Sequence, residues 1–156
     1  MLELRTAIIL VLIHLIYYSI LQVFADIVRM GSVKNTPNKL ISKLRTDFHI
    51  NIRTFKKNTN HYGFAWFKTI YLNESLFRNE KALMFTFYHE LFHVQNKHKR
   101  NTLLLRLVFS LTPITLAFAH WAVFTAIYIT MSWSMYKINE IYEKRANNYA
   151  KQMTEQ

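Results

Sequence analysis

The chain has 156 residues, no cysteine, two glycines and a formal net charge of +11. The absence of cysteine excludes thiolate ligands for a metal and fits a reducing compartment. No repeat, low-complexity tract or Gly/Ser-rich linker divides the chain, and the positive charge comes without a nucleic-acid-binding motif, so we expect one small domain and no nucleic-acid partner.

The first apolar segment runs from Thr6 to Ala25 and carries no charged residue. A helix of about 20 residues crosses a hydrocarbon core of about 30 Å, so we expect a membrane anchor in residues 1–25. A cleavable signal peptide is less favoured, because few basic residues precede the segment and no A-x-A site follows it. His14, Tyr17 and Tyr18 keep open a milder alternative, a helix that lies in the membrane interface.

The next region predicts a short helix and two strands. The helix follows Pro37 and covers Asn38–Leu44, whereas Ile50–Phe55 and Phe64–Leu72 have the composition of strands. The turn-rich stretch between the strands, Lys57–Gly63, predicts that they form a β-hairpin or a small sheet.

The most informative stretch is His89-Glu90-Leu91-Phe92-His93, an H-E-x-x-H pattern on a predicted helix. Residues four apart share a helix face, so both imidazoles can reach one Zn²⁺ at roughly 2.0 to 2.1 Å. Glu90 then stands beside the metal, where it can take a proton from water and pass it to a leaving amine. The helix is predicted by a capping residue and by apolar residues at helical spacing: Asn79, Leu83, Phe87, Leu91 and Val94. The plainer alternative is an amphipathic helix whose histidines meet backbone acceptors.

A catalytic zinc needs a third protein ligand and one open position. The candidates after the motif are Glu140, Glu143, Glu155, His98 and His120. His98 lies nine residues after His89 and is rotated by about 180° from it on a continuing helix, so we expect it to point away from the metal, as a residue of the surface or one that contacts a metal ligand. The metzincin class is excluded, because its third histidine and its glycine would fall at Lys99 and Asn96.

Glu143 has the most suggestive neighbours among these candidates. It begins an E-x-x-A-N-x-x-A pattern in which Ala146, Asn147 and Ala150 share its helix face. Small residues at Ala146 and Ala150 would let this helix approach the His89 helix closely. Asn147 could accept a hydrogen bond from a liganding imidazole and fix its tautomer.

Together the two motifs resemble the integral-membrane gluzincin metallopeptidases of the HtpX and CAAX prenyl protease kind. The likeness covers residues 70–150 and rests on H-E-x-x-H, with a histidine five residues beyond it, and on the downstream E-x-x-A-N-x-x-A. It implies that His89, His93 and Glu143 bind one Zn²⁺ and that Glu90 is the general base.

The family usually has aspartate where Asn147 stands and often a small residue where Phe92 stands. Asparagine resembles instead the ImmA/IrrE regulatory metallopeptidases, which cleave repressors and are typically soluble. The BlaR-type sensor peptidases are similar in having H-E-x-x-H in a membrane setting. The resemblance therefore leaves a regulatory peptidase or binding module, acting on one partner such as a repressor, as the alternative function.

A second apolar segment, Leu107–Tyr136, contains no Asp, Glu, Lys or Arg. As one straight helix it would be about 45 Å long and would carry Glu143 to the side opposite the histidines. We therefore expect a hairpin over residues 103–136 that turns back near Ala117–Trp121, with Pro113 kinking its first arm. A buried hairpin in a wholly soluble core is the competing interpretation.

Basic residues flank both apolar segments on the side of the predicted site: Arg29, Lys34, Lys39, Lys43, Arg45, Lys97, Lys99, Arg100, Lys137, Lys144 and Arg145. By the positive-inside tendency, the catalytic site faces the cytoplasm, and we expect a bacterial inner membrane as the location. The same residues would contact anionic lipid headgroups, which accounts for the charge without nucleic acid.

Substrate and transition-state contacts can be named only as candidates. An edge strand beside the metal would align an extended peptide, which points to Phe64–Tyr71 and, within it, to Phe64, Trp66, Lys68 and Ile70. An ordinary half-buried strand explains the same pattern. The scissile carbonyl could be polarised by a tyrosine, arginine or histidine, for which the candidates are Tyr149, Tyr142, Arg145 and His61.

The expected protein is thus of the α+β class, a mainly helical zincin-like domain in residues 26–156 with a small β-hairpin or sheet before the active-site helix. An N-terminal membrane helix and the apolar hairpin 103–136 complete it. The expected function is hydrolysis of peptide bonds in peptide or protein substrates near the membrane, with one Zn²⁺ per chain.

Overall fold

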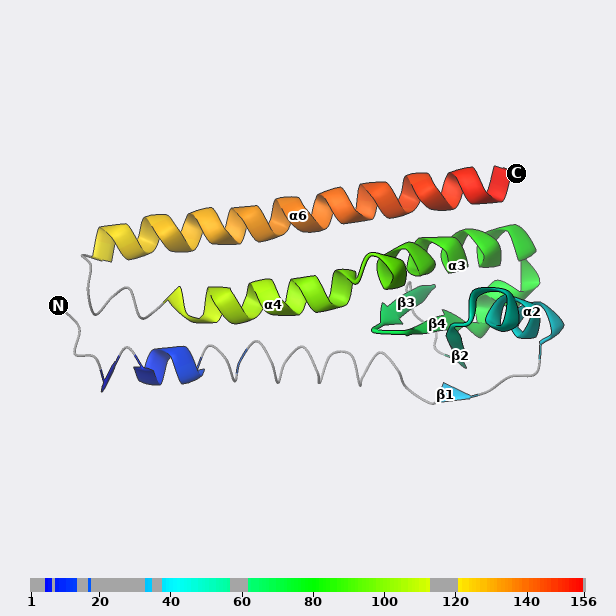
Figure 1. The fold of residues 1–156 in the computed structure, drawn as a ribbon, viewed down its shortest axis with the longest axis horizontal. Coiled ribbons are helices and arrows are strands. Elements are labelled where there is room, and N and C mark those ends of the chain that lie inside the picture. The colour runs from blue at the N-terminus through cyan, green and yellow to red at the C-terminus, as the bar shows by residue number, and fades with distance from the viewer. Residues whose placement is uncertain are drawn as a thin grey trace. The chain divides into compact units, whose positions relative to one another are not determined.

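The computed structural model describes residues 5–6, 8–13, 17, 33–34, 38–56, 62–112 and 121–155 (Figure 1). The chain divides into two compact units. The first comprises Met1–Ile27 and Asn101–Glu140, and the second comprises Val28–Arg100 and Ile141–Gln156. Each unit is described by itself below.

The second unit contains a four-stranded sheet. Its strands are β1 (Val33–Lys34), β2 (Asn51–Phe55), β3 (Gly63–Trp66) and β4 (Thr69–Asn73), in the spatial order β1-β2-β4-β3. β2 and β4 run parallel, whereas β1 pairs with β2 and β3 pairs with β4 in antiparallel fashion. β3 is therefore an edge strand.

The predicted hairpin of Ile50–Phe55 with Phe64–Leu72 is wrong in its pairing. The second predicted strand is two strands, because the chain reverses at Phe67 and Lys68, and Phe67 takes a left-handed backbone conformation with φ of 49°. The reversal makes β3 and β4 the hairpin and leaves β4 parallel to β2.

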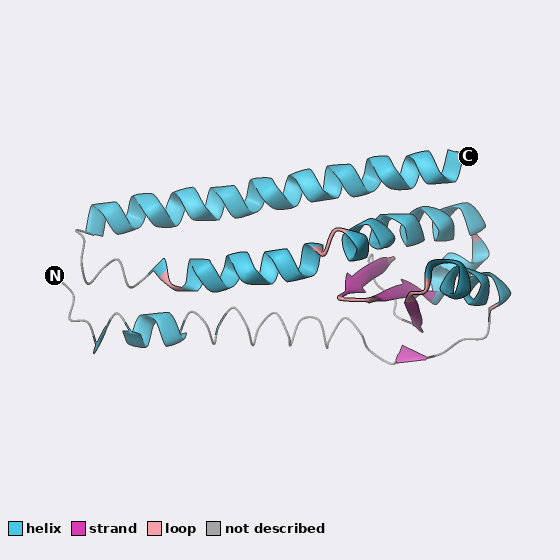
Figure 2. Ribbon diagram, in the orientation of Figure 1, coloured by secondary structure: helices cyan, strands magenta, loops and turns pink. Residues whose placement is uncertain are grey.

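Two helices pack on this sheet, and polar caps mark their starts. α2 (Lys39–Phe48) begins after Asn38, whose side chain accepts from the Leu40 amide at 2.8 Å. α3 (Glu80–Gln95) follows the 3₁₀ helix η1 (Glu74–Arg78), and it is capped by Asn79 through the Ala82 amide at 3.0 Å. Both helices begin where the sequence predicts, because side-chain capping of free amides is a local interaction. Figure 2 shows the strands gathered beside these helices.

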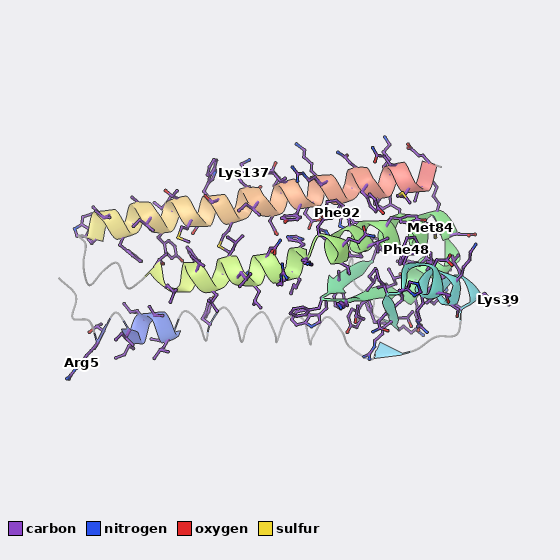
Figure 3. The ribbon with its side chains drawn as sticks, in the orientation of Figure 1. Arg5, Lys39, Phe48, Met84, Phe92 and Lys137 are labelled. Carbon is purple, nitrogen blue, oxygen red and sulfur yellow. The ribbon has the colours of Figure 1, made fainter. Side chains whose placement is uncertain are left out.

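The core of the second unit lies between the sheet and the helices. Its fully buried apolar residues come from every layer: Ile41, Leu44, Ile52, Ile70, Leu72, Leu76, Leu83, Phe87, Leu91 and Ala150. Phe48 of α2 joins it by packing its ring 5.3 Å from that of Phe87 (Figure 3). The protein is thus mainly helical with a small sheet, as an α+β class requires.

The last part of α6 (Trp121–Glu155) completes the second unit by packing on α3. Ala146 and Ala150 are fully buried. Tyr149 contacts Tyr88 and Phe92 of α3, with ring centroids 6.4 and 5.8 Å away, and Phe92 lies between the two helices (Figure 3). The two buried alanines lie on the same helix face as Glu143, as the E-x-x-A-N-x-x-A pattern predicts.

In the first unit, the described residues of α4 (His98–Ser110) and α6 contact one another. The rings of Phe109 and Tyr128 are 4.8 Å apart, so these parts of the two helices lie side by side, as the hairpin expected over residues 103–136 requires. Most of the predicted turn, Ala117–Trp121, lies outside the described residues, as does Pro113.

Within the described ranges, no helix is both long enough and apolar enough to cross a membrane. Most of the anchor expected in residues 1–25 lies outside those ranges, which include only residues 5–6, 8–13 and 17 of it.

Candidate metal centre

α3 brings the two motif histidines together on one face. His89 and His93 are one helical turn apart, and their Nε2 atoms are 3.1 Å from each other. Their rings meet at a steep angle, with centroids 4.8 Å apart and an interplanar angle of 71°. Both Nε2 atoms therefore converge on one point beside the helix.

α6 brings Glu143 to the same point from the far end of the sequence. Glu143 Oε2 is 3.3 Å from His89 Nε2, and Glu143 Oε1 is 3.4 Å from His93 Nε2. Among the described residues, these three side chains are the group of histidine and acidic residues that could hold a metal ion, with their ligand atoms within 4.8 Å of one another.

The spacing of these atoms fits a tetrahedral metal ion. Ligands at roughly 2.0 to 2.1 Å from the ion, on the corners of a tetrahedron, lie about 3.3 Å apart. Here the two Nε2 atoms are 3.1 Å apart, Glu143 Oε2 is 3.3 Å from His89 Nε2, and Glu143 Oε1 is 3.4 Å from His93 Nε2, so each separation is close to that edge length. Two imidazoles and a carboxylate leave a fourth corner of the tetrahedron for water or substrate.

Asn147, on the next turn of α6 after Glu143, determines how His89 is protonated. Its Oδ1 lies 3.0 Å from His89 Nδ1, and an amide oxygen can only accept, so Nδ1 carries the hydrogen. The lone pair of Nε2 then points at the Glu143 carboxylate. Two electron-rich atoms at this distance need a positive charge between them, either a proton or a metal ion.

The electrostatics of the group agree with that requirement. Hydrogen bonds from His89 and His93 hold the pKa of the Glu143 carboxyl far below its ordinary value, against the opposing effect of burial. Burial opposes protonation of His89, but the hydrogen bond to Glu143 and the charges of Glu90 and Glu143 outweigh it and raise the pKa of His89. The site attracts a cation.

Glu90 stands beside this group in a buried position, with 8% of its surface exposed. Burial raises the pKa of its carboxyl, while the neighbouring His89 and His93 and a hydrogen bond from the Ala65 backbone amide oppose the rise. The carboxylate is thus anchored to the edge strand β3.

The register of the hairpin explains why the Ala65 amide is available. The Asn73 amide donates to the Tyr62 carbonyl at 2.8 Å, so the pair formed by Tyr62 and Asn73 is hydrogen-bonded. Bonding alternates along an antiparallel ladder, which makes the pairs of Gly63 and Ala65 the non-bonded ones. Their backbone groups consequently point away from β4, toward the free edge where Glu90 lies.

Gly63 was not predicted from the sequence, although the close position of β3 beside Glu90 depends on it. A Cβ atom at this position would lie 2.7 Å from Thr86 Cγ2, 3.1 Å from the Tyr71 carbonyl oxygen and 3.4 Å from Glu90 Cγ. Only glycine lets β3 lie this close to α3. Gly63 is one of two glycines in the chain and falls within a strand pattern. A glycine in a strand often marks a place where another segment approaches closely, so this position could have been singled out.

The helix that was expected to continue through His98 is interrupted, and of the two predicted places for this residue, the surface or contact with a metal ligand, the structure has the second. α3 ends at Gln95, and Lys97 takes a left-handed conformation with φ of 52° before α4 starts at His98. The bend returns His98 to the site, where its Nδ1 is 2.6 Å from His93 Nδ1.

The other candidate ligands are placed elsewhere. Glu140 pairs with Lys137 at 2.8 Å, and Glu155 lies 4.0 Å from Lys151. His120 lies outside the described residues.

The candidates for polarising the scissile carbonyl are not brought to one place. Tyr149 packs on Tyr88 and Phe92, and burial raises its pKa. Tyr142 stacks on His98, and Arg145 is exposed. His61 lies outside the described residues, so its predicted role stays a prediction.

Only part of the predicted substrate-binding segment, Phe64–Tyr71, lies on an edge strand of the described sheet. Phe64 and Trp66 lie on β3, which has a free edge, and Lys68 lies in the exposed turn. Ile70 is wrong as a substrate contact, because it is fully buried on β4, which is paired on both sides. The turn at Phe67 and Lys68, which divides the predicted strand, is the reason.

Comparison of the chain with known protein families, curated proteins and solved structures finds no match.

Proposed function

We propose that the protein is a zinc-dependent endopeptidase, with His89, His93 and Glu143 as metal ligands and Glu90 as general base. The observation that carries the proposal is the convergence of His89 Nε2, His93 Nε2 and the Glu143 carboxylate, in which each nitrogen lies within 3.4 Å of a carboxylate oxygen and 3.1 Å from the other nitrogen. A buried carboxylate next to the first ligand, at the free edge of a sheet, supports peptide hydrolysis over a purely structural metal site.

Zinc, when bound, lowers the pKa of a coordinated water toward about 7 and polarises the substrate carbonyl. The Glu90 carboxylate accepts a proton from the attacking water as the water oxygen bonds to the carbonyl carbon. It then donates that proton to the amide nitrogen as the C–N bond breaks. A raised pKa brings Glu90 nearer to the working pH, where a group that must both accept and donate a proton is most effective.

The substrate in this proposal is an extended peptide that lies along β3. The backbone groups of Gly63 and Ala65 point toward the free edge, and the Ala65 amide already holds Glu90. An added strand would form main-chain hydrogen bonds there and bring its scissile bond next to Glu90. Recognition through backbone groups tolerates many side chains.

The second candidate function is narrower. In it, the protein is a regulatory peptidase that acts on one protein partner. It is favoured by Asn147, whose bond to His89 uses the residue type found in ImmA/IrrE-like enzymes. The two candidates share the metal site and differ in the range of peptides cleaved.

We place the protein at a membrane, with the site on the cytoplasmic side. The support is a set of exposed large apolar side chains on α4, just after it, and on α6 in the first unit: Leu103, Leu104, Leu107, Val108, Leu111, Trp121, Val123, Ile129, Trp133 and Tyr136. Lipid would cover such side chains, and the neighbouring basic residues would contact anionic headgroups.

The deciding experiment measures metal content and peptide cleavage together in wild type, Glu143→Gln, Glu140→Gln and Glu90→Gln. We expect about one zinc per chain in wild type and Glu140→Gln and a large loss in Glu143→Gln. Glu90→Gln should keep its zinc and lose roughly 10²- to 10⁴-fold in cleavage rate, as expected for a general base. The Glu140→Gln variant is the control, since Glu140 lies on the same helix and pairs with Lys137.

Wild-type protein without zinc under chelator-free conditions would remove the proposal. Zinc with equal cleavage in wild type and Glu90→Gln would remove the catalytic role of Glu90. Cleavage of a broad set of unfolded peptides would favour a general peptidase, and cleavage of one partner alone would favour the regulatory candidate.

A further inference from the structure

We propose that His98, held in place by Tyr142, is a positioning residue that fixes the tautomer and orientation of the ligand His93. The inference rests on the proposed metal site and names a residue that the H-E-x-x-H and downstream glutamate motifs do not require. His98 acts through His93 and does not contact the metal.

The contact between the two histidines is a hydrogen bond in the plane of the rings. His98 Nδ1 and His93 Nδ1 are 2.6 Å apart, whereas the ring centroids are 4.6 Å apart with an angle of 33° between the planes. Because the nitrogen atoms are much closer than the ring centres, the rings meet edge to edge. A face-to-face stack would not place the two nitrogens in hydrogen-bonding geometry.

The direction of this hydrogen bond follows from the role of His93. A neutral imidazole has one protonated and one unprotonated nitrogen, and the metal takes the unprotonated one. His93 presents Nε2 to Glu143 and His89, so its hydrogen must be on Nδ1. The Nδ1 atom of His98 is therefore the acceptor, and the hydrogen of His98 is on Nε2.

Tyr142 holds the His98 ring in the orientation that this bond needs. The two rings are stacked, with centroids 4.2 Å apart and planes within 7°. Tyr142 directly precedes Glu143 on α6, so a single helix turn supplies one metal ligand and the support for the partner of another. Together with Asn147, which orients His89, α6 determines the position of both motif histidines.

The bend at Lys97 is the backbone feature that makes the contact possible. On an uninterrupted α3 helix, His98 would lie about 140° around the axis from His93 and could not reach it. The left-handed residue breaks the helix between them and allows the side chain to fold back. Residues other than glycine rarely adopt this conformation, so the bend at Lys97 is a specific feature of the chain.

The test compares His98→Asn with His98→Leu. The Oδ1 atom of asparagine occupies the branch that Nδ1 occupies in histidine and is an acceptor, whereas leucine has nearly the same shape without one. Both variants lose the stack on Tyr142 equally. Zinc affinity, measured by competition with a chromophoric chelator, should fall roughly 10- to 100-fold in His98→Leu, and His98→Asn should recover most of the loss.

A second readout reports the tautomer directly. In zinc-loaded wild type with ¹⁵N-labelled histidine, NMR should show a slowly exchanging proton on His93 Nδ1. We expect this proton to exchange rapidly with water in His98→Leu and slowly in His98→Asn. Denaturant unfolding of both variants without metal provides the stability control, and we expect equal values.

The outcomes separate the two proposals. Wild-type protein that binds no zinc contradicts the proposed function itself. Wild-type protein that binds zinc, with an affinity unchanged in both variants, overturns the role of His98 alone. Equal weakening in His98→Asn and His98→Leu also overturns it, because packing of the ring on Tyr142 would then matter rather than the acceptor.

Discussion

Gly63 shows how closely a single residue couples the sheet to the site. In Gly63→Ala the new methyl group would lie 2.7 Å from Thr86 Cγ2 and 3.4 Å from Glu90 Cγ, so β3 and α3 must separate. We expect a loss of about 1 to 3 kcal/mol in the free energy of unfolding, typical of overpacking. The hydrogen bond from Ala65 to Glu90 would lengthen, so peptide cleavage should fall as well. Urea denaturation and a cleavage assay measure the two effects.

The double variant Gly63→Ala with Thr86→Ser is the matched control for this clash. Serine lacks the Cγ2 atom and keeps the hydroxyl, which donates to the Ala82 carbonyl at 2.9 Å. Part of the lost stability should return in the double variant. If Gly63→Ala were as stable and active as wild type, the close approach of β3 to α3 would not limit the site.

Single residues could be predicted from the sequence where their position depends only on spacing along a helix. His89, Glu90 and His93 could be placed on one turn of helix because the period of a helix is fixed. Gly63 and Ala65 could not be predicted, because their roles depend on which strand edge faces α3. That arrangement arises from tertiary packing and leaves no mark within a few residues of either position.

At the scale of elements, the site depends on contact between α3 and α6. Ala146 is fully buried where the two helices meet, one turn beyond Glu143. A larger side chain there would push α6 away and carry the carboxylate out of reach of His89 and His93. In Ala146→Leu we expect a loss of about 1 to 3 kcal/mol in unfolding free energy and of most of the zinc affinity.

Asn148→Leu provides the control for Ala146→Leu. Asn148 lies two residues away on the same helix and is exposed, so leucine there adds the same apolar side chain without displacing α6. Zinc content and urea unfolding should match wild type within about 0.5 kcal/mol, as for most surface changes. Equal zinc binding in both variants would show that α6 need not approach α3 closely.

Elements were predictable to the extent that local interactions define them. The cap predicted at Asn79 was correct, because its side chain bonds to the Ala82 amide three residues ahead. The hairpin pairing of β2 and the continuation of the helix from His93 to His98 were wrong for a common reason. Each depends on one residue with positive φ, Phe67 or Lys97, and neither residue type signals such a conformation.

At the scale of the whole molecule, the question is what covers the apolar side chains of the first unit. On α4, Leu104, Leu107 and Val108 have between 52% and 55% of their surface exposed. Soluble monomers rarely expose contiguous apolar patches larger than a few hundred Å². The chain also carries basic residues next to this segment, at Lys99 and Arg100, which favours a lipid surface with anionic headgroups over a neutral protein partner.

We therefore expect purified protein to bind vesicles that contain anionic lipid, more weakly in high salt. Changing Leu104, Leu107 and Val108 together to serine should reduce binding strongly, because each buried apolar side chain contributes about 1.5 to 3 kcal/mol. Ile141→Ser is the control, since Ile141 is exposed to a similar degree but belongs to the second unit. Flotation of the protein with the vesicles measures binding, and size-exclusion chromatography without lipid measures self-association. If the wild type stayed off the vesicles but formed oligomers that the triple variant did not, a second copy of the chain would cover this surface, and the proposed membrane location would be wrong.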